Sequence, residues 1–369
     1  MGLDLRWLKD KEQIQMLERG YLEKNETPEQ RYQTICDSIQ RYSTKLATTE
    51  ESKEYVKDIG KRFEDYISKG WTSFSTPIIR SFGSEFNLPI SCNHTMLEDS
   101  MDGIYRRLYE TGILASQGSG TAVNISKLRS IGTPIASGGD ANSILDWIEL
   151  YADMITKTAQ NSQRRGFITF YLDADHPEIM DFLDIGTERI PKDKQRFLTT
   201  ITTAVVLPTG FRKALKEGDK EKRKIFTKIL NTRKEAGFPF ILDEENSNIG
   251  LCQSYQDKNI KINNANICIE AIEYADHEKT FACCLSSIVV YHWDEIKKDP
   301  NFLFDMNIAL DCVIEEYIEK GRKIRGIESA IKFAEEHRTI GIGISAFHSY
   351  LQKKDIAFGS LPSFSVNND

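Results

Sequence analysis

An amide, a thiol and a carboxylate follow one another at every second position in the stretch INNANICIEAI, residues 262–272. They belong to Asn266, Cys268 and Glu270, and the apolar Ile267 and Ile269 lie between them. Side chains of a β-strand alternate between its two faces, so a strand here would present all three polar groups on one face. The pattern predicts a strand with a reactive side. A half-buried strand whose polar side meets water is the alternative.

The three polar groups could share one reaction. Glu270 would lie two residues from the thiol of Cys268 on the same face, where a carboxylate can act as a base. Asn266 can donate and accept hydrogen bonds at once without changing charge, which suits it to hold hydroxyl groups. The stretch alone leaves both interpretations open, and the rest of the chain must decide between them.

Two further segments place cysteines in short, apolar, strand-like surroundings. Cys92 ends the run LPISC, and Cys283 and Cys284 stand side by side in FACCLSS. Taken singly, each is typical of an inert cysteine in a protein core. The chain has 7 cysteines without C-x-x-C spacing, which predicts neither a secreted disulfide framework nor a zinc site. We expect reduced thiols and no metal bound by this chain.

The composition limits the classes of partner. With 369 residues, the chain can form one large domain or one large and one small. Its formal net charge of -7 argues against a broad phosphate-binding surface, so we expect no nucleic-acid partner. No uncharged apolar run approaches the ~18 residues of a membrane span, and the N-terminus lacks an apolar signal region. The sequence predicts a soluble, cytoplasmic protein.

The elements that must position these residues follow an α/β pattern. Residues 1–72 are predicted to form a helical segment, with Pro28 after Thr27 at the first turn of one helix. From residue 73 onward, helical segments alternate with β-rich runs: PISC, TAVNIS, FITFYLD, TTITTAVVLP, FPFIL, NICIEAI, FACCLSSIVV and TIGIGISAF. This alternation favours parallel strands in an α/β fold.

The clearest helical segment is ANSILDWIELYADMITKTAQ, residues 141–160. Its apolar residues recur at helical spacing and form one stripe: Ile144, Trp147, Ile148, Tyr151, Met154 and Ile155. We expect a helix that packs this stripe against the core.

Taken together, the motifs resemble the large, catalytic subunit of ribonucleotide reductase. The resemblance runs from TPEQRY to FGSLPS through STPII, LPISC, DSMDGI, GSGTAVNISKLRSIGTPI, QRRGFITFYLDADHPEIMDFL, NICIEAI, FACCLSS and RTIGIGISAFHSYLQ. It implies that residues 73–369 form the first part of a ten-stranded α/β barrel, including the finger-loop motif of the family. The helical residues 1–72 would precede it without the ATP cone of many relatives.

The resemblance implies a radical enzyme that replaces the 2'-hydroxyl of a ribonucleoside diphosphate with hydrogen. A thiyl radical on Cys268 would remove the 3'-hydrogen, Glu270 would accept the 3'-hydroxyl proton, and Asn266 would hold the sugar hydroxyls. Cys92 and Cys283 match the cysteines that supply two electrons and end as a disulfide. The neighbouring Cys284 leaves the pairing open by one residue, although the spacing before LSS favours Cys283.

The resemblance also implies a substrate pocket. Thr76, Ser91 and Gly120 match positions that line it in the family. A glycine in GSGTAV would let the backbone approach a sugar or phosphate closely.

The resemblance further implies an allosteric specificity site. Asp99, Arg129 and Arg164 match its positions, where a carboxylate can hold the sugar hydroxyl of a nucleotide effector and arginines its phosphates. Ordinary surface charge is the alternative. The segment RRG, residues 164–166, would be the flexible loop that passes the identity of the effector to the active site.

Later parts of the family are not found in the sequence: the second half of the barrel, the serine-rich phosphate loop, the tandem tyrosines of the radical relay and the C-terminal cysteine pair. We therefore expect the N-terminal portion of a split or truncated catalytic subunit. It would need a complementing C-terminal fragment, a small metal-containing subunit that generates the radical, and dNTP or ATP effectors. The catalytic unit is expected to be a homodimer.

Two alternatives stay open at this point. One is an adenosylcobalamin-dependent reductase built on the same barrel, which would need no small subunit. The other is a nucleotide-binding or assembly component without turnover of its own.

Overall fold

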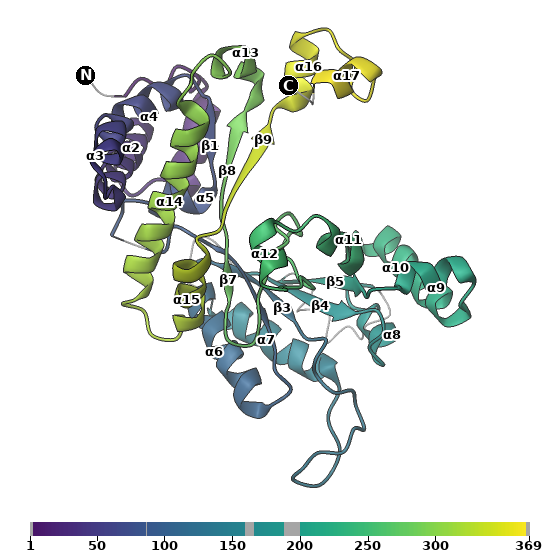
Figure 1. The fold of residues 1–369 in the computed structure, drawn as a ribbon. Helices are drawn as coiled ribbons and strands as arrows, with labels where there is room; N and C mark the ends of the chain where they lie inside the picture. The colour runs from purple at the N-terminus through teal and green to yellow at the C-terminus, as the bar shows by residue number, and fades with distance from the viewer. Residues whose placement is uncertain (1–2, 86, 159–165, 188–199, 367–369) are drawn as a thin grey trace. The chain divides into compact units, whose positions relative to one another are not determined.

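The computed structural model describes residues 3–85, 87–158, 166–187 and 200–366. The chain divides into two compact units, and each is described by itself (Figure 1). Unit 1 comprises Met1–Ile90, Cys283–Lys323 and His337–Asp369. Unit 2 comprises Ser91–Ala282 and Ile324–Glu336. The predicted division into a helical segment, residues 1–72, and a barrel portion, residues 73–369, was drawn from the sequence pattern and stays a proposal.

Helices dominate the first part of unit 1: α1 (Lys11–Gly20), α2 (Pro28–Leu46), α3 (Glu50–Val56) and α4 (Ile59–Ser68). The expected start of α2 is confirmed, because Thr27 forms a capping box with Gln30 and Pro28 is its first residue. The long helix α14 (Phe302–Gly321) packs against α2. Its buried Asp305 accepts a hydrogen bond of 2.7 Å from Nε of Arg62 in α4, so a buried ion pair joins the later segment to the N-terminal helices.

The sheet of unit 1 has three strands in the order β1 (Thr72–Phe74), β8 (Cys284–Val289), β9 (Ile340–Ser345). β1 runs antiparallel to β8, and β9 runs parallel to it. The remaining helices of this unit are short: α5 (Thr76–Ser81), η3 (Val290–His292), α13 (Trp293–Ile296), α16 (Phe347–Lys353) and α17 (Leu361–Val366). Among the described residues, β9 forms one edge of the sheet.

Unit 2 is built on a six-stranded sheet in the order β6-β5-β4-β3-β2-β7. The strands are β2 (Cys92–Met96), β3 (Gly120–Asn124), β4 (Ile168–Asp173), β5 (Ile201–Leu207), β6 (Phe240–Asp243) and β7 (Phe281–Ala282). β2 to β6 are parallel to their neighbours, and β7 is antiparallel to β2. The predicted parallel α/β arrangement is therefore present in this unit.

Helices supply the connections and much of the core of unit 2. They are α6 (Met101–Ser116), α7 (Ile144–Thr158), α8 (Ile179–Phe182), α9 (Phe211–Glu217), α10 (Lys220–Ala236), α11 (Glu244–Ile249), α12 (Gln253–Asp257) and α15 (Glu328–His337). The apolar stripe of α7 is confirmed, because Ile144, Ile148 and Tyr151 are buried in a cluster with Phe170 of β4 and Val205 of β5.

The other face of this sheet carries a second, smaller core cluster. Ala122, Tyr171 and Ala204 form a second cluster with Ala265, and Ile267 packs against it. Beside the alanines there is room for the connecting segment that carries Ala265 and Ile267, which packs on this face.

This segment is the stretch that the alternation predicted to be a strand, and that prediction is wrong. Residues 261–266 have no regular secondary structure, residues 267–268 form a turn, and Ile269 has a left-handed backbone with φ of 64°. The backbone amide of Asn266 donates to the carbonyl of Ala271 at 3.0 Å, so the chain reverses direction here. The alternation arises from a turn lying on the sheet, where local hydrogen bonds replace those of a neighbouring strand.

Candidate active site

Asn266 is the centre of the turn. Its Oδ1 accepts from the amide of Ala271 at 3.1 Å, and its carbonyl accepts from the amide of Ile269 at 3.2 Å. Its side chain and backbone therefore close the loop that holds Cys268 and Glu270. Both of these residues are exposed at the tip of the turn, where a bound molecule could reach them.

Side chains of the sheet hold the turn in place. The hydroxyl of Tyr171 donates to the carbonyl of Asn266 at 2.7 Å, and Oγ1 of Thr169 donates to the carbonyl of Ile267 at 2.8 Å. Burial raises the pKa of Tyr171, so its hydroxyl stays protonated and remains a donor. The turn is therefore fixed through its own backbone, which leaves the thiol and carboxylate at its tip unused by these contacts.

Gly120 has a specific packing role at this site. A Cβ at this position would come within 2.7 Å of Cδ1 of Ile267, closer than side chains pack. The sequence suggested that a glycine here admits a sugar or phosphate. In the structure, its open side admits the apolar side chain of the turn, and this contact sets how closely the turn approaches β3.

Cys92 begins β2 beside Gly120 in the parallel ladder. Nδ2 of Asn266 donates to its Sγ at 2.9 Å. Burial raises the pKa of the Cys92 thiol to about 12, and the charge of Glu270 also raises it, although the bond from Asn266 acts in the opposite direction. Cys92 is thus a neutral thiol at physiological pH, and it interacts electrostatically with both Glu270 and Cys268.

Four of the residues predicted from the sequence therefore meet in unit 2: Cys92, Asn266, Cys268 and Glu270. Ser91 precedes Cys92, is buried, and accepts a bond of 2.9 Å at its carbonyl from the amide of Gly120. The arrangement places the partly buried thiol of Cys92 beside the amide of Asn266, with an exposed thiol and a carboxylate on the turn. Such a set can exchange a hydrogen atom and a proton with one small molecule.

The contrast between the thiols of this unit predicts their reactivity. Because burial raises the pKa of the Cys92 thiol, little of it is ionised at pH 8, and the thiolate is the reacting form. Cys268 and Cys252 are both exposed. We expect brief iodoacetamide treatment at pH 8, followed by peptide mass spectrometry, to label these two first and Cys92 last. Equal labelling of Cys92 and Cys252 would contradict the described environment.

The adjacent cysteines 283 and 284 differ in their relation to the strands. The antiparallel ladder between β2 and β7 ends with Asn93 opposite Ala282. Cys92 is the residue before Asn93, and Cys283 is the residue after Ala282. Cys284 begins β8, is buried in unit 1, and donates from Sγ to the carbonyl of Leu310 in α14 at 3.6 Å. Burial also raises the pKa of its thiol.

Thr76 lies in unit 1, at the first residue of α5. Its Oγ1 donates to the hydroxyl of Tyr21 at 3.4 Å. Both line a cavity of about 670 Å³ that is rich in hydroxyl side chains, among them Thr72, Ser73, Ser75, Ser286 and Ser287. The N-terminal segment closes one wall of this cavity through Trp7 and Met16.

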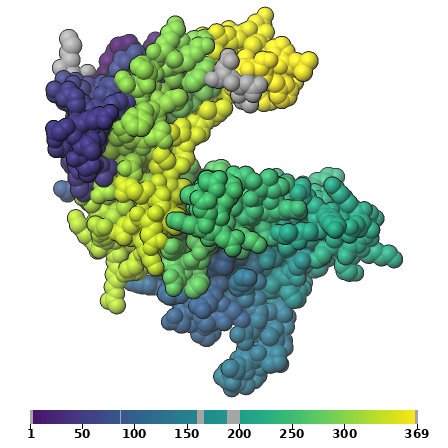
Figure 2. Space-filling view, viewed as in Figure 1, coloured from purple at the N-terminus to yellow at the C-terminus, as the bar shows by residue number. Residues whose placement is uncertain are grey.

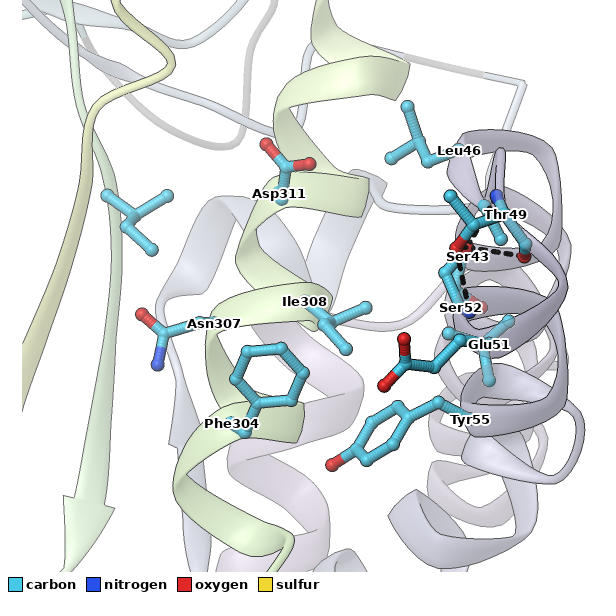
Figure 3. Close-up of a pocket in the computed structure, with 13 residues that line it drawn as sticks. Ser43, Leu46, Thr49, Glu51, Ser52, Tyr55, Phe304, Asn307, Ile308 and Asp311 are labelled. Carbon is cyan, nitrogen blue, oxygen red and sulfur yellow. Dashed lines mark hydrogen bonds between the residues drawn. The ribbon is translucent and has the colours of Figure 1, made fainter.

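A second cavity of unit 1, of about 580 Å³, lies between α2, α3 and α14 (Figure 3). Figure 3 shows Tyr55 and Phe304 close together at its rim, and their rings meet edge to face with centroids 5.2 Å apart. Its polar groups serve local structure, because Thr49 and Ser52 cap α3 and Asp311 accepts from Arg338 at 2.7 Å. None of the described site residues predicted from the sequence lines this cavity.

Of the three predicted effector residues, the structure brings two together. Nε of Arg129 donates to Oδ2 of Asp99 at 2.7 Å, and both side chains are about one-third exposed. Arg164 lies outside the described residues. The pair is accessible at the surface of unit 2, as a site for a charged ligand requires.

Sequence reasoning missed the residues that hold the turn. Asn124 donates from Nδ2 to the carbonyl of Asn263 at 3.2 Å, and Thr169 and Tyr171 act as described. A signal was present, because these polar side chains share the face of Gly120 and Ala122 under the two-residue alternation of β3 and β4. Polar residues on one face of two buried strands can indicate a segment lying across that face.

The described residues contain no group of three or more His, Cys, Asp or Glu side chains placed to hold a metal ion. Within the same ranges, every helix is too short or too polar to cross a bilayer.

Comparison with known proteins gives consistent matches. A family model described as ribonucleotide reductase, barrel domain, matches residues 90–222 and 219–369. The chain is 25% identical over 429 residues to the ribonucleoside-diphosphate reductase large subunit of Invertebrate iridescent virus 3, covering 96% of this chain and 64% of that protein. It is 26% identical over 357 residues to the corresponding subunit of Variola virus, covering 84% of this chain and 45% of the relative.

A solved structure, the Actinobacillus ureae class Id ribonucleotide reductase alpha subunit, matches with a TM-score of 0.86 and 29% identity. The match covers 100% of this chain and 65% of that one. The chain thus spans between about half and two-thirds of the length of these relatives.

Proposed function

Since the chain belongs to the ribonucleotide reductase barrel-domain family, we propose that it reduces ribonucleoside diphosphates to 2'-deoxyribonucleoside diphosphates as the N-terminal portion of a catalytic subunit. The predicted fold class, part of the barrel of this family, is confirmed. The observation that carries the proposal is the turn at Asn266–Ala271, which holds Cys268 and Glu270 above the protected thiol of Cys92.

The first step is assigned to Cys268. A thiyl radical on this residue takes the hydrogen atom from C3' of the substrate, which leaves a carbon radical and restores the thiol. Glu270 accepts the proton of the 3'-hydroxyl, and the neighbouring 2'-hydroxyl leaves as water after a thiol of the Cys92–Cys283 pair gives it a proton. The exposure of both residues at the tip of the turn supports their access to a sugar. Asn266, fixed by its own loop, would offer its amide to the hydroxyls.

The electrons are assigned to Cys92 and Cys283. Their two thiols become one disulfide, and the two hydrogen equivalents they release reduce the substrate, so that one ribonucleotide gives one deoxyribonucleotide and one water. Cys268 then returns its hydrogen atom to C3' and is again a thiyl radical. The raised pKa of Cys92 supports this role, because a reductant that delivers hydrogen must remain a thiol until it reacts.

The choice of Cys283 over Cys284 also has support. The thiol of Cys284 already donates a hydrogen bond to the carbonyl of Leu310 in α14, whereas the spacing before LSS favours Cys283. We assign Thr76, Ser91 and Gly120 to the substrate pocket, with hydroxyl donors of the cavity beside Thr76 as candidates to bind substrate oxygens.

The proposed activity needs partner chains and a nucleotide effector. The radical would come from a metal-containing small subunit, and a C-terminal chain would complete the barrel. Asp99, Arg129 and Arg164 would bind a nucleotide effector in a dimer of catalytic units. The test is to mix the chain with both partners and assay the reduction of a ribonucleoside diphosphate. Turnover that requires adenosylcobalamin instead of the small subunit would favour the other radical source, and no turnover in either mixture would contradict the proposal.

The dithiol assignment gives its own prediction. One turnover without external reductant is expected to link Cys92 to Cys283, and peptide mapping after alkylation should show this disulfide. Cys283→Ala should prevent both the disulfide and turnover. Cys284→Ala is the matched control and should retain most activity, because its thiol is engaged in a hydrogen bond to the carbonyl of Leu310. A peptide that links Cys92 to Cys284 would contradict the assignment.

A further inference from the structure

A long hairpin connects β3 to α7 and projects from unit 2 (Figure 1). Its arms are joined by the amide of Gly132, which donates to the carbonyl of Ala141 at 3.0 Å, and the amide of Ala141, which donates to the carbonyl of Thr133 at 2.8 Å. In the space-filling view it is the blue projection at the lower edge (Figure 2). Residues 136–140 at its tip are all exposed. The position of the hairpin therefore depends on contacts at its base.

One buried carboxylate makes several of these contacts. Glu178, just before α8, is only 5% exposed. Its Oε1 accepts from the amide of Ile131 at 2.9 Å and from the amide of Ile144 at 3.4 Å. Its Oε2 accepts from the hydroxyl of Ser143. Glu178 thus joins the first arm of the hairpin to the residues that follow the second arm.

The neighbouring His176 holds the start of the same hairpin. Its Nδ1 accepts from the amide of Glu178 at 3.2 Å, so Nε2 must carry the ring proton. Nε2 lies 2.9 Å from the carbonyl of Leu128 and therefore donates to it. The imidazole fixes both the residue before the hairpin and the backbone of Glu178, which orients the carboxylate.

Charge and helix direction favour a carboxylate at this place. Glu178 accepts from the first residue of α7, a helix of 15 residues, and the N-terminus of a helix attracts negative charge. If the carboxylate is removed, the buried amide of Ile144 and that of Ile131 lose their partner, and unsatisfied buried donors are destabilising. The hairpin and the start of α7 should then separate from the end of β4.

The hairpin also carries Arg129, whose backbone amide and Nε both donate to Asp99, at 3.4 and 2.7 Å. We infer that Glu178 is a positioning residue of the effector site, which holds the hairpin in the conformation where Arg129 and Asp99 can meet a nucleotide. This inference rests on the proposed function for the assignment of the effector site. The anchoring of the hairpin by Glu178 stands on the contacts of the chain alone.

The experiment compares Glu178→Gln with the parent in the completed enzyme. Glutamine keeps the size of the side chain but loses the charge and one acceptor. We expect effector binding, measured by titration with a deoxyribonucleoside triphosphate, to weaken about tenfold, the equivalent of ~1.4 kcal/mol. The ratio of effector-stimulated to effector-free turnover should fall with it. Ser143→Ala removes one donor and leaves the carboxylate, so its effect should be smaller.

Asp181→Asn is the matched control, because Asp181 is exposed on α8 and its replacement changes the net charge equally. This variant should bind effector as the parent does. Hydrogen exchange of the hairpin amides gives a readout that does not depend on function. Exchange in residues 129–142 should quicken in Glu178→Gln, while exchange in β4 should be unchanged.

Unchanged effector affinity and unchanged exchange in Glu178→Gln would overturn the inference. Equal losses in Asp181→Asn and Glu178→Gln would also overturn it, because a change of net charge would then explain both. If the parent itself binds no effector, the effector assignment of the proposed function fails. Faster exchange confined to the hairpin would in that case still support the anchoring role of Glu178.

Discussion

Replacing Cys268 by serine is expected to abolish ribonucleotide reduction in the completed enzyme while leaving the fold intact. A hydroxyl is nearly the same size as a thiol, but its O–H bond is too strong to be converted into a usable radical. The turn that carries Cys268 is closed by Asn266 and Ala271 and held by Tyr171, and these contacts do not involve the thiol. The free energy of unfolding, measured by thermal denaturation, should therefore change by less than about 0.5 kcal/mol, as for most exposed sites.

Cys252→Ser provides the control for this change, because Cys252 is also an exposed cysteine of unit 2. It should retain full turnover. Effector binding should be unchanged in both variants. Retained reduction above a few per cent of the parent in Cys268→Ser would show that the radical lies on another residue.

The sequence predicted the regular elements of the fold well where periodicity and burial coincide. The stripe of α7 is visible in the sequence because Ile144, Ile148 and Tyr151 each face the core. The strands β3 to β6 are visible because they are short apolar runs covered on both faces. In these elements local pattern and tertiary packing require the same residues.

The segment around Cys268 shows where such reasoning fails. Alternation of polar and apolar residues indicates a strand only if a neighbouring strand supplies hydrogen bonds, and sequence does not reveal whether one is present. Here the partners are side chains, the hydroxyls of Thr169 and Tyr171, which are more than ninety residues away along the chain. The motif suggested which residues to propose as reactive, but it did not indicate the contacts that join their turn to Cys92.

Glu178 shows a second limit. In the sequence it is one acidic residue in DADHPEIMDFL, no different in type from Asp181. Its role depends on burial and on amides of Ile131 and Ile144, which belong to the far side of a long connection. Charged residues that serve as internal anchors are recognised only after the fold places them beside unpaired backbone groups.

The chain alone is expected to show no turnover, and addition of a C-terminal chain together with the small subunit is expected to restore it. The relatives that it matches are longer, since it covers 64% of one large subunit and 45% of another. In unit 1, β9 is at the edge of its sheet, and its Ile344 is 59% exposed. An exposed apolar edge strand readily accepts a further strand. A partner that binds only the folded chain stabilises it by ~2.7 kcal/mol at a hundredfold excess over its Kd.

The measurement is thermal unfolding of the chain with and without the C-terminal chain, followed by the reduction assay with the small subunit. The partner should raise the Tm by several degrees. Ile344→Lys should remove most of this gain, because a charge on β9 opposes docking of an apolar strand, whereas Ile249→Lys, at a residue of unit 2 that is 73% exposed, should not. Turnover by the chain and the small subunit without a C-terminal chain would refute the need for completion. An equal loss of the gain in both lysine variants would show that β9 is not the docking edge.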